Sequence, residues 1–165
     1  MGSRVKTILV PAKLFSRFLE LGRRIERPLG VLALLGSTPN PDANEVPALD
    51  PLLETCDSVM TYRRRHFSRP RWETVVELLL YDSTNPRGVM SQAEILSKQC
   101  EKLPGEKDFG LMPKIREHVA SLVQPSPVPF MIPDRRGFEE RAAAFEYLSD
   151  LLTQHYFSHS VRRVY

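Results

Sequence analysis

Apolar residues recur every three or four positions along most of this chain, which is the spacing of one face of an α-helix. The pattern predicts helices over the stretches 13–35, 50–67, 70–81, 86–103, 113–123 and 136–159. Stretches rich in proline and glycine separate them, and no segment alternates apolar and polar residues as a strand does. We therefore predict an all-α protein, an antiparallel helical bundle of about six helices.

The first predicted helix carries a charge within its apolar side. We expect one side to face the core, formed by Phe15, Phe18, Leu19, Gly22, Leu29 and Ala33. Glu26 lies in the middle of this side, flanked by Arg23 and Arg27. A buried carboxylate is costly unless a cation meets it. Pro28 lacks the backbone donor that a helix needs, so we expect it to kink or divide the helix.

The second predicted helix carries a charge of the opposite sign on its own apolar side. Arg63 falls within that side, whereas Arg64 and Arg65 turn away and Tyr62 lies on another face. We therefore predict a buried ion pair between Glu26 and Arg63 across the helix interface. Removing one partner of such a pair costs about 3–5 kcal/mol, because the other charge is left buried alone.

A polar connection, 82–87, joins the third and fourth predicted helices, and two interpretations of it are open. In the first, Asp82 or Asn85 accepts hydrogen bonds from nearby backbone donors and Arg87 pairs with Asp82. In the second, Asn85 and Pro86 begin a helix whose free amides and Arg87 face an anion.

Length and composition favour one ordinary globular domain. The chain has 165 residues and a net charge of +3, a mild basic excess that neither requires nor excludes a phosphate-bearing partner. We expect one helical domain over residues 1–165, with residues 1–12 irregular or left over from cloning. Cys56 and Cys100 fall on apolar helix sides and are expected to be reduced core residues.

Motifs for metal, nucleotide or nucleophilic chemistry are missing from the sequence. His155 and His159 are spaced for one helix face, but no third ligand accompanies them. Glycine-rich phosphate loops and a serine elbow are also missing, so we expect no metal and no cofactor. The apolar run near the start lacks the shape of a signal peptide and is too short to span a bilayer, so the cytoplasm is the expected location.

Several segments together resemble the alpha-E family, an all-helical domain known for a Glu-Arg motif. The similar segments are 18–27 (FLELGRRIER), 57–65 (DSVMTYRRR), 78–82, 85–92 and 156–159, in this order along the chain. The resemblance assigns Glu26 and Arg27 to the Glu-Arg motif. It also implies motif roles for Asp57, Tyr62, Arg63, Asn85, Pro86, Arg87 and Gln92.

The resemblance implies a bacterial protein that works beside, or fused to, a circularly permuted ATP-grasp ligase in peptide ligation or modification. Family members usually begin with another helical half, so the chain is expected to be the C-terminal portion of a longer protein. Its partner is then expected to be the ligase or that missing half, with self-association as a further option. Two residues depart from the family pattern: Gly88 replaces a common serine, and Pro28 replaces a helix former.

We therefore expect an accessory module of an ATP-grasp ligase without catalytic activity in isolation. Two alternatives stay open: an enzyme that uses Glu26 as acid or base and Arg63 as an electrostatic clamp, and a basic module that binds nucleic acid. The expected polar network, whether functional or structural, comprises Arg23, Glu26, Arg27, Asp57, Tyr62, Arg63, Asp82, Asn85, Arg87 and Gln92.

Overall fold

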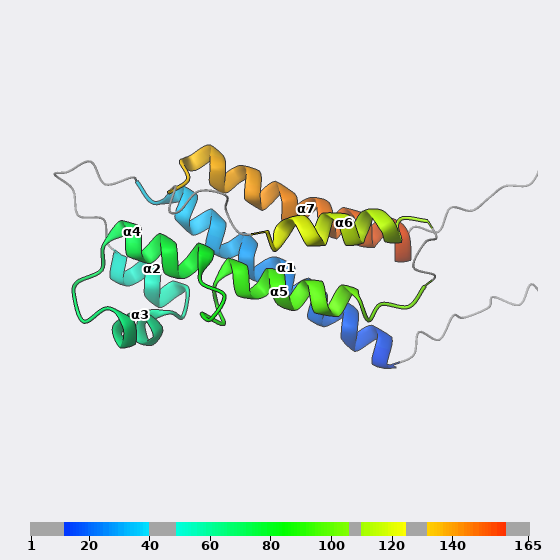
Figure 1. Ribbon diagram of the computed structural model, residues 1–165, viewed down its shortest axis with the longest axis horizontal. Coiled ribbons are helices and arrows are strands. Elements are labelled where there is room, and N and C mark those ends of the chain that lie inside the picture. The colour runs from blue at the N-terminus through cyan, green and yellow to red at the C-terminus, as the bar shows by residue number, and fades with distance from the viewer. Residues whose placement is uncertain (1–11, 40–48, 106–109, 125–131, 158–165) are drawn as a thin grey trace, which may run out of the picture.

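A computed structural model describes residues 12–39, 49–105, 110–124 and 132–157 (Figure 1). These residues form helices, turns and connections without a strand, which confirms the predicted all-α class. The α-helices are α1 (Ala12–Ser37), α2 (Leu49–Thr55), α3 (Val59–Arg65), α4 (Trp72–Val76), α5 (Val89–Cys100), α6 (Met112–Leu122) and α7 (Arg135–Tyr156). A π-helical segment, η1 (Glu77–Tyr81), directly continues α4.

The four longest helices form the body of the bundle. Helices α5 and α7 both pack on α1 and run opposite to it, and α6 packs on α5 and α7 and runs opposite to them (Figure 1). The short helices α2, α3 and α4 gather at the end of the bundle where α1 finishes. This arrangement confirms the antiparallel bundle, and residues 55–57 and Arg87 lie beside residues 26–34 of α1.

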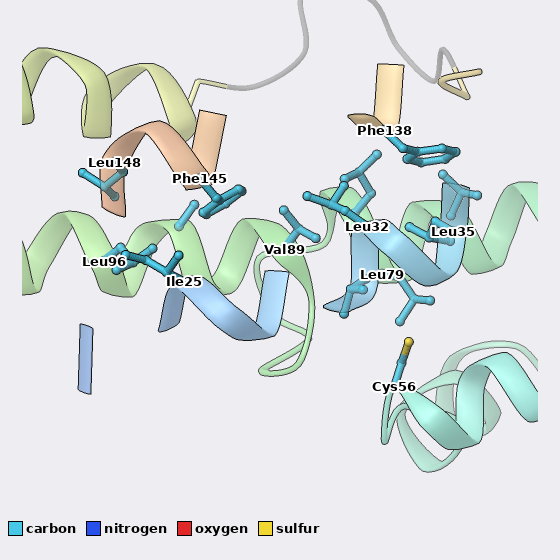
Figure 2. Close-up of a cluster of buried hydrophobic side chains, with 14 of the residues drawn as sticks. Ile25, Leu32, Leu35, Cys56, Leu79, Val89, Leu96, Phe138, Phe145 and Leu148 are labelled. Atoms are coloured by element: carbon cyan, nitrogen blue, oxygen red, sulfur yellow. The ribbon is translucent and has the colours of Figure 1, made fainter. Parts of the chain in front are cut away.

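The core lies between α1, α5 and α7 and extends to α4 and η1. Ile25 of α1 lies beside Leu96 of α5, and Leu32 of α1 lies between Val89 of α5 and Phe138 of α7 (Figure 2). Leu79 of η1 is fully buried and belongs to the same core, which extends to the short helices. Burying a side chain of this size contributes about 1.5–3 kcal/mol, so these residues hold α1 in place.

Helix α1 buries a face that is rotated about its axis from the predicted one, so that only Phe18 and Leu29 of the predicted side pack against the core. Its buried residues are Leu21, Ile25, Pro28, Val31, Leu32 and Leu35. On the predicted inner side, Phe15 is 62% exposed and Leu19 is 48% exposed. Helix α1 also continues through Pro28, which is buried, so of the two predicted effects, a kink or a division, the division does not occur. The lost backbone hydrogen bond is offset by burial of the ring in the core.

Other helix boundaries differ from the pattern at two turns. The predicted helix 50–67 is divided into α2 and α3 by a turn at Cys56, Asp57 and Ser58. The fourth helix begins at Val89 rather than at residue 86, because the preceding residues form a turn with Gly88 as the N-cap. The predicted helix over 70–81 appears as α4 with η1.

The cysteines and the histidine pair can be compared with their predictions. Cys56 and Cys100 are both free and buried, as predicted. Burial raises the pKa of each thiol to about 11. His155 lies near the end of α7, whereas His159 falls outside the described residues. Among the described residues, no helix is long and apolar enough to cross a membrane.

Candidate functional site

The turn between α2 and α3 places an aspartate at a left-handed position that is usually occupied by glycine. Asp57 has a φ of 52°, and its amide donates to the Glu54 carbonyl at 2.9 Å. The Ser58 amide donates to the Leu53 carbonyl at 2.8 Å. These two bonds define a Schellman motif, with Asp57 at the left-handed position that glycine favours. The carboxylate is therefore held at an exposed corner at some conformational cost.

The π-helical segment leaves one carbonyl available to a side chain. The Asp82 amide donates to Glu77 rather than to Leu78, at 3.1 Å. The Leu78 carbonyl instead accepts from Asn85 Nδ2 at 3.1 Å. Single π turns of this kind recur at functional sites because they redirect backbone groups in this way.

Asn85 joins three segments from a fully buried position. Its Nδ2 also donates to Ser58 Oγ at 3.3 Å, and its Oδ1 accepts from the Arg87 amide at 3.3 Å. Asn85 thus ties the α2–α3 turn to η1 and to the turn before α5. It does not begin the next helix, so the predicted cap with proline at 86 is wrong. The predicted acceptance of a backbone amide by Asn85 is confirmed.

Gln92 fastens α5 to both α1 and the same turn. It is fully buried, and its Nε2 donates to the Pro86 carbonyl at 2.6 Å. Its Oε1 accepts from Arg24 Nη1 at 3.1 Å, and Arg24 Nε donates to Glu20 at 2.6 Å. These hydrogen bonds link Glu20, Arg24 and Gln92 in series and fix the position of α5 along α1.

Tyr62 and Asp82 fix α3. Tyr62 is buried, and its hydroxyl lies 2.7 Å from Thr74 Oγ1. Asp82 forms an ion pair with Arg65 and accepts from the Thr84 amide at 2.8 Å. Asp82 therefore accepts a backbone donor as predicted, but its cation is Arg65. The predicted pairing of Asp82 with Arg87 is wrong, because Arg87 pairs with Asp57 and Arg65 of α3 reaches Asp82 instead.

Charged residues from three segments meet at one hollow beside α1. We call this the charged hollow; it has a volume of about 380 Å³ and is lined by residues that include Glu26, Arg27, Gly30, Cys56, Asp57 and Arg87. Arg87 Nη2 lies 2.7 Å from Asp57 Oδ2 at its edge. Glu26 and Arg27 are exposed side chains of α1. The hollow therefore offers an accessible carboxylate and an accessible guanidinium next to an ion pair that is already formed.

The predicted ion pair between Glu26 and Arg63 does not form. Glu26 is exposed and lines the charged hollow, whereas Arg63 is exposed and lines a different hollow with Asp50 and His66. Among the described residues, Glu26 makes no ion pair. The prediction failed because it placed the wrong face of α1 against the core. Arg23 is exposed on α1 and does not line the charged hollow.

The chemistry available in the charged hollow is binding by charge. Cys56 lines it, but burial raises the pKa of this thiol to about 11, so it stays protonated at neutral pH. No group of three possible metal ligands occurs in the part of the chain that the structure describes. Charge-assisted hydrogen bonds from an arginine and to a glutamate suit a ligand with both an acidic and a basic group.

Three residues of this region were not identified from the sequence. Ser58 is fully buried and accepts from Asn85, and Arg24 and Arg65 make the ion pairs described above. Ser58 could have been found from the polar run 57–58 inside an otherwise apolar helix pattern. The choice among neighbouring arginines has no comparable sequence signal, because it depends on where each helix begins.

The fold and this polar cluster define a class of protein: an all-helical domain with charged residues gathered where its helices join. A family model described as "Alpha-E: A predicted alpha-helical domain with a conserved ER motif" matches residues 14–157. The chain therefore belongs to the alpha-E family, as the resemblance of its segments predicted.

Mycobacterial proteins are among the relatives of this chain. Uncharacterized protein Rv2567 from Mycobacterium tuberculosis (strain ATCC 25618 / H37Rv) is 38% identical over 90 residues, which is 53% of this chain and 10% of that protein. Uncharacterized protein Mb2597 from Mycobacterium bovis has the same identity and coverage. The match thus spans about a tenth of these relatives' length. No solved structure matches the chain.

Proposed function

We propose that this alpha-E chain is an accessory module of an ATP-grasp-type ligase in peptide ligation or modification, and that its charged hollow holds a peptide segment. The observation that carries the proposal is the meeting of Glu26, Arg27, Asp57 and Arg87, from three separate segments, at one open hollow. The resemblance to alpha-E proteins supplies the ligase context.

The charges of the hollow support a peptide as its ligand. Glu26 can accept hydrogen bonds from an ammonium group, and the fork of Arg27 can bind a carboxylate through two bonds. Asp57 and Arg87 already pair at the other side, so they offer directed polar groups without an unpaired charge. A peptide with an acidic and a basic group within a few residues would engage both signs.

The architecture of the region supports binding rather than covalent chemistry. The Cys56 thiol is protonated at neutral pH for the reason given above, so it lacks the reactive form of a nucleophile. Glu26 and Arg63 line separate hollows, which removes the geometric basis of an enzyme that uses this pair in one cleft. The match to a tenth of much longer relatives also favours a module that works within a larger assembly.

The test uses the purified chain with an ATP-grasp ligase encoded beside its gene. Binding of the chain to the ligase is measured by isothermal titration calorimetry. Ligase activity is measured as peptide-dependent release of ADP. We expect binding and faster ADP release with the wild-type chain, and at least a tenfold weaker affinity for the double variant Glu26→Gln and Arg27→Gln.

The matched control is the double variant Arg135→Gln and Glu139→Gln, an exposed ion pair on α7. It removes one charge of each sign on a helix that does not line the charged hollow and should bind as the wild type does. A wild-type chain that neither binds nor stimulates the ligase overturns the proposal, as does equal binding by both double variants. Turnover of ATP or peptide by the chain alone, lost in Glu26→Gln, would support the enzyme alternative instead.

A further inference from the structure

The outward face of α1 is uncovered over most of its length. We call it the outer stripe; its residues are Phe15, Leu19, Gly22, Glu26, Gly30 and Ala33, and all are exposed. They recur every three or four positions, so they form one continuous strip about 27 Å long. Two large apolar side chains left open on one strip favour contact with another apolar surface.

The side chains of the outer stripe are large in its N-terminal part, and its later part carries glycines. Its N-terminal part carries Phe15 and Leu19, with exposed fractions of 62% and 48%. Its later part carries Gly22 and Gly30, and a Cβ atom added at either glycine would meet nothing within 4 Å. Each exposed glycine costs a helix about 0.5–1 kcal/mol relative to alanine. The fold gains no packing in return, whereas a second helix gains a close approach.

Opposite charges lie near the middle of the outer stripe. Glu26 is at the centre of the outer stripe, and Arg23 lies along its edge one turn earlier. Both side chains are exposed, and neither makes an ion pair within the described part of the chain. A partner that brings a cation to Glu26 and an anion to Arg23 would satisfy both.

We propose that the outer stripe binds the outer stripe of a second copy of this chain, with the two α1 helices antiparallel. A twofold axis passing between positions 24 and 25 brings Leu19 opposite Gly30 of the partner subunit. The same axis brings Glu26 beside Arg23 of the partner subunit, and both contacts occur twice. Leu19 then meets a glycine and opposite charges meet, which is the self-complementarity that a symmetric dimer requires.

The charges exclude a parallel pairing of the same surface. In a parallel pair related by a twofold axis along the helices, Glu26 would face Glu26 of the partner subunit and like charges would repel. A single pair of helices buries an area at the small end for a stable complex, so we expect a dimer of micromolar affinity. Glu26 and Gly30 also line the charged hollow, so the second copy would form part of its rim.

Charge exchange gives the sharpest test. Sedimentation equilibrium at about 100 µM, a concentration at which a micromolar dimer is populated, should give a dimer for the wild-type chain. The variants Glu26→Arg and Arg23→Glu should each be monomeric, because each places like charges together twice. An equimolar mixture of these two variants should form a heterodimer, because their charges complement one another. Arg64→Glu reverses an exposed charge on α3, outside the outer stripe, and this control variant should remain a dimer.

Added bulk tests the register of the pair. Gly30→Met has open space in the monomer and should leave the folded chain intact while shifting the wild-type dimer to monomer. Ala143→Met places the same side chain on an exposed position of α7 and should have no effect. A monomeric wild-type chain, charge variants that dimerise alone, a mixture that stays monomeric, or a dimer insensitive to Gly30→Met would each overturn the proposal. No ligase is present, so the outcome is independent of the proposed function.

Discussion

Replacing Asn85 by alanine removes three hydrogen bonds from a fully buried side chain. The severest loss is at the Leu78 carbonyl, because the π turn has already directed its usual backbone donor to Glu77. A buried acceptor without a partner costs about 1–3 kcal/mol, and the vacated volume adds to this, so we expect a total loss of about 2–4 kcal/mol. For a chain of this size, that loss lowers the melting temperature by roughly 5–15 °C.

Urea denaturation followed by circular dichroism measures this free energy of unfolding directly. Gln124→Ala is the matched control, because it removes an amide from an exposed side chain and should change the free energy by less than about 0.5 kcal/mol. Asn85→Asp keeps the shape but turns the Nδ2 donor into an acceptor opposite Leu78, so it should destabilise at least as much as alanine at pH 7. If Asn85→Ala and the control have the same free energy of unfolding, Asn85 does not stabilise the fold by linking the three segments.

Three further changes test the turns and the core. Gly88→Ala should lose about 1–3 kcal/mol in urea denaturation, because the new Cβ would lie 3.2 Å from two carbonyl oxygens of η1. Asp57→Gly should be more stable than Asp57→Ala by about 1 kcal/mol, because only glycine accepts this positive φ freely; calorimetry that ranks them in the reverse order would count against the left-handed turn. Burial raises the pKa of the Cys56 and Cys100 thiols from 9.0 to about 11, so the unfolded chain loses these protons first and stability should fall as pH rises from 9 to 11. The loss should be roughly 2 kcal/mol per thiol, and the double alanine variant should show a shallower alkaline decline in its denaturation midpoint.

Helix class and most helix positions follow from the spacing of apolar residues, but the inward face of α1 does not. This helix carries two apolar strips, one through Leu21, Ile25 and Leu32 and one through Phe15 and Leu19. Both have helical spacing, so periodicity alone cannot select between them. Tertiary packing against α5 and α7 selects the first strip, and it thereby turns Glu26 outward.

The polar contacts of the candidate site were harder to predict than the helices. The break at Asp57 contains neither glycine nor proline, so the sequence reads as one continuous helix. Restarting the helix at Val59 rotates the arginines that follow, which is why Arg65 rather than Arg63 forms an ion pair in the described residues. The π turn also has no sequence signature, yet it creates the acceptor that Asn85 uses. Sequence identified most of the polar residues, whereas their pairing depends on these local changes of helix geometry.

The free energy of unfolding of Glu26→Gln, measured by urea denaturation, tests most directly whether this carboxylate serves binding rather than folding. Glu26 is exposed and makes no ion pair among the described residues, so we expect a value within about 0.5 kcal/mol of the wild type. A loss of about 3 kcal/mol or more is what stranding a buried guanidinium would produce, and that result would contradict the outward placement of Glu26.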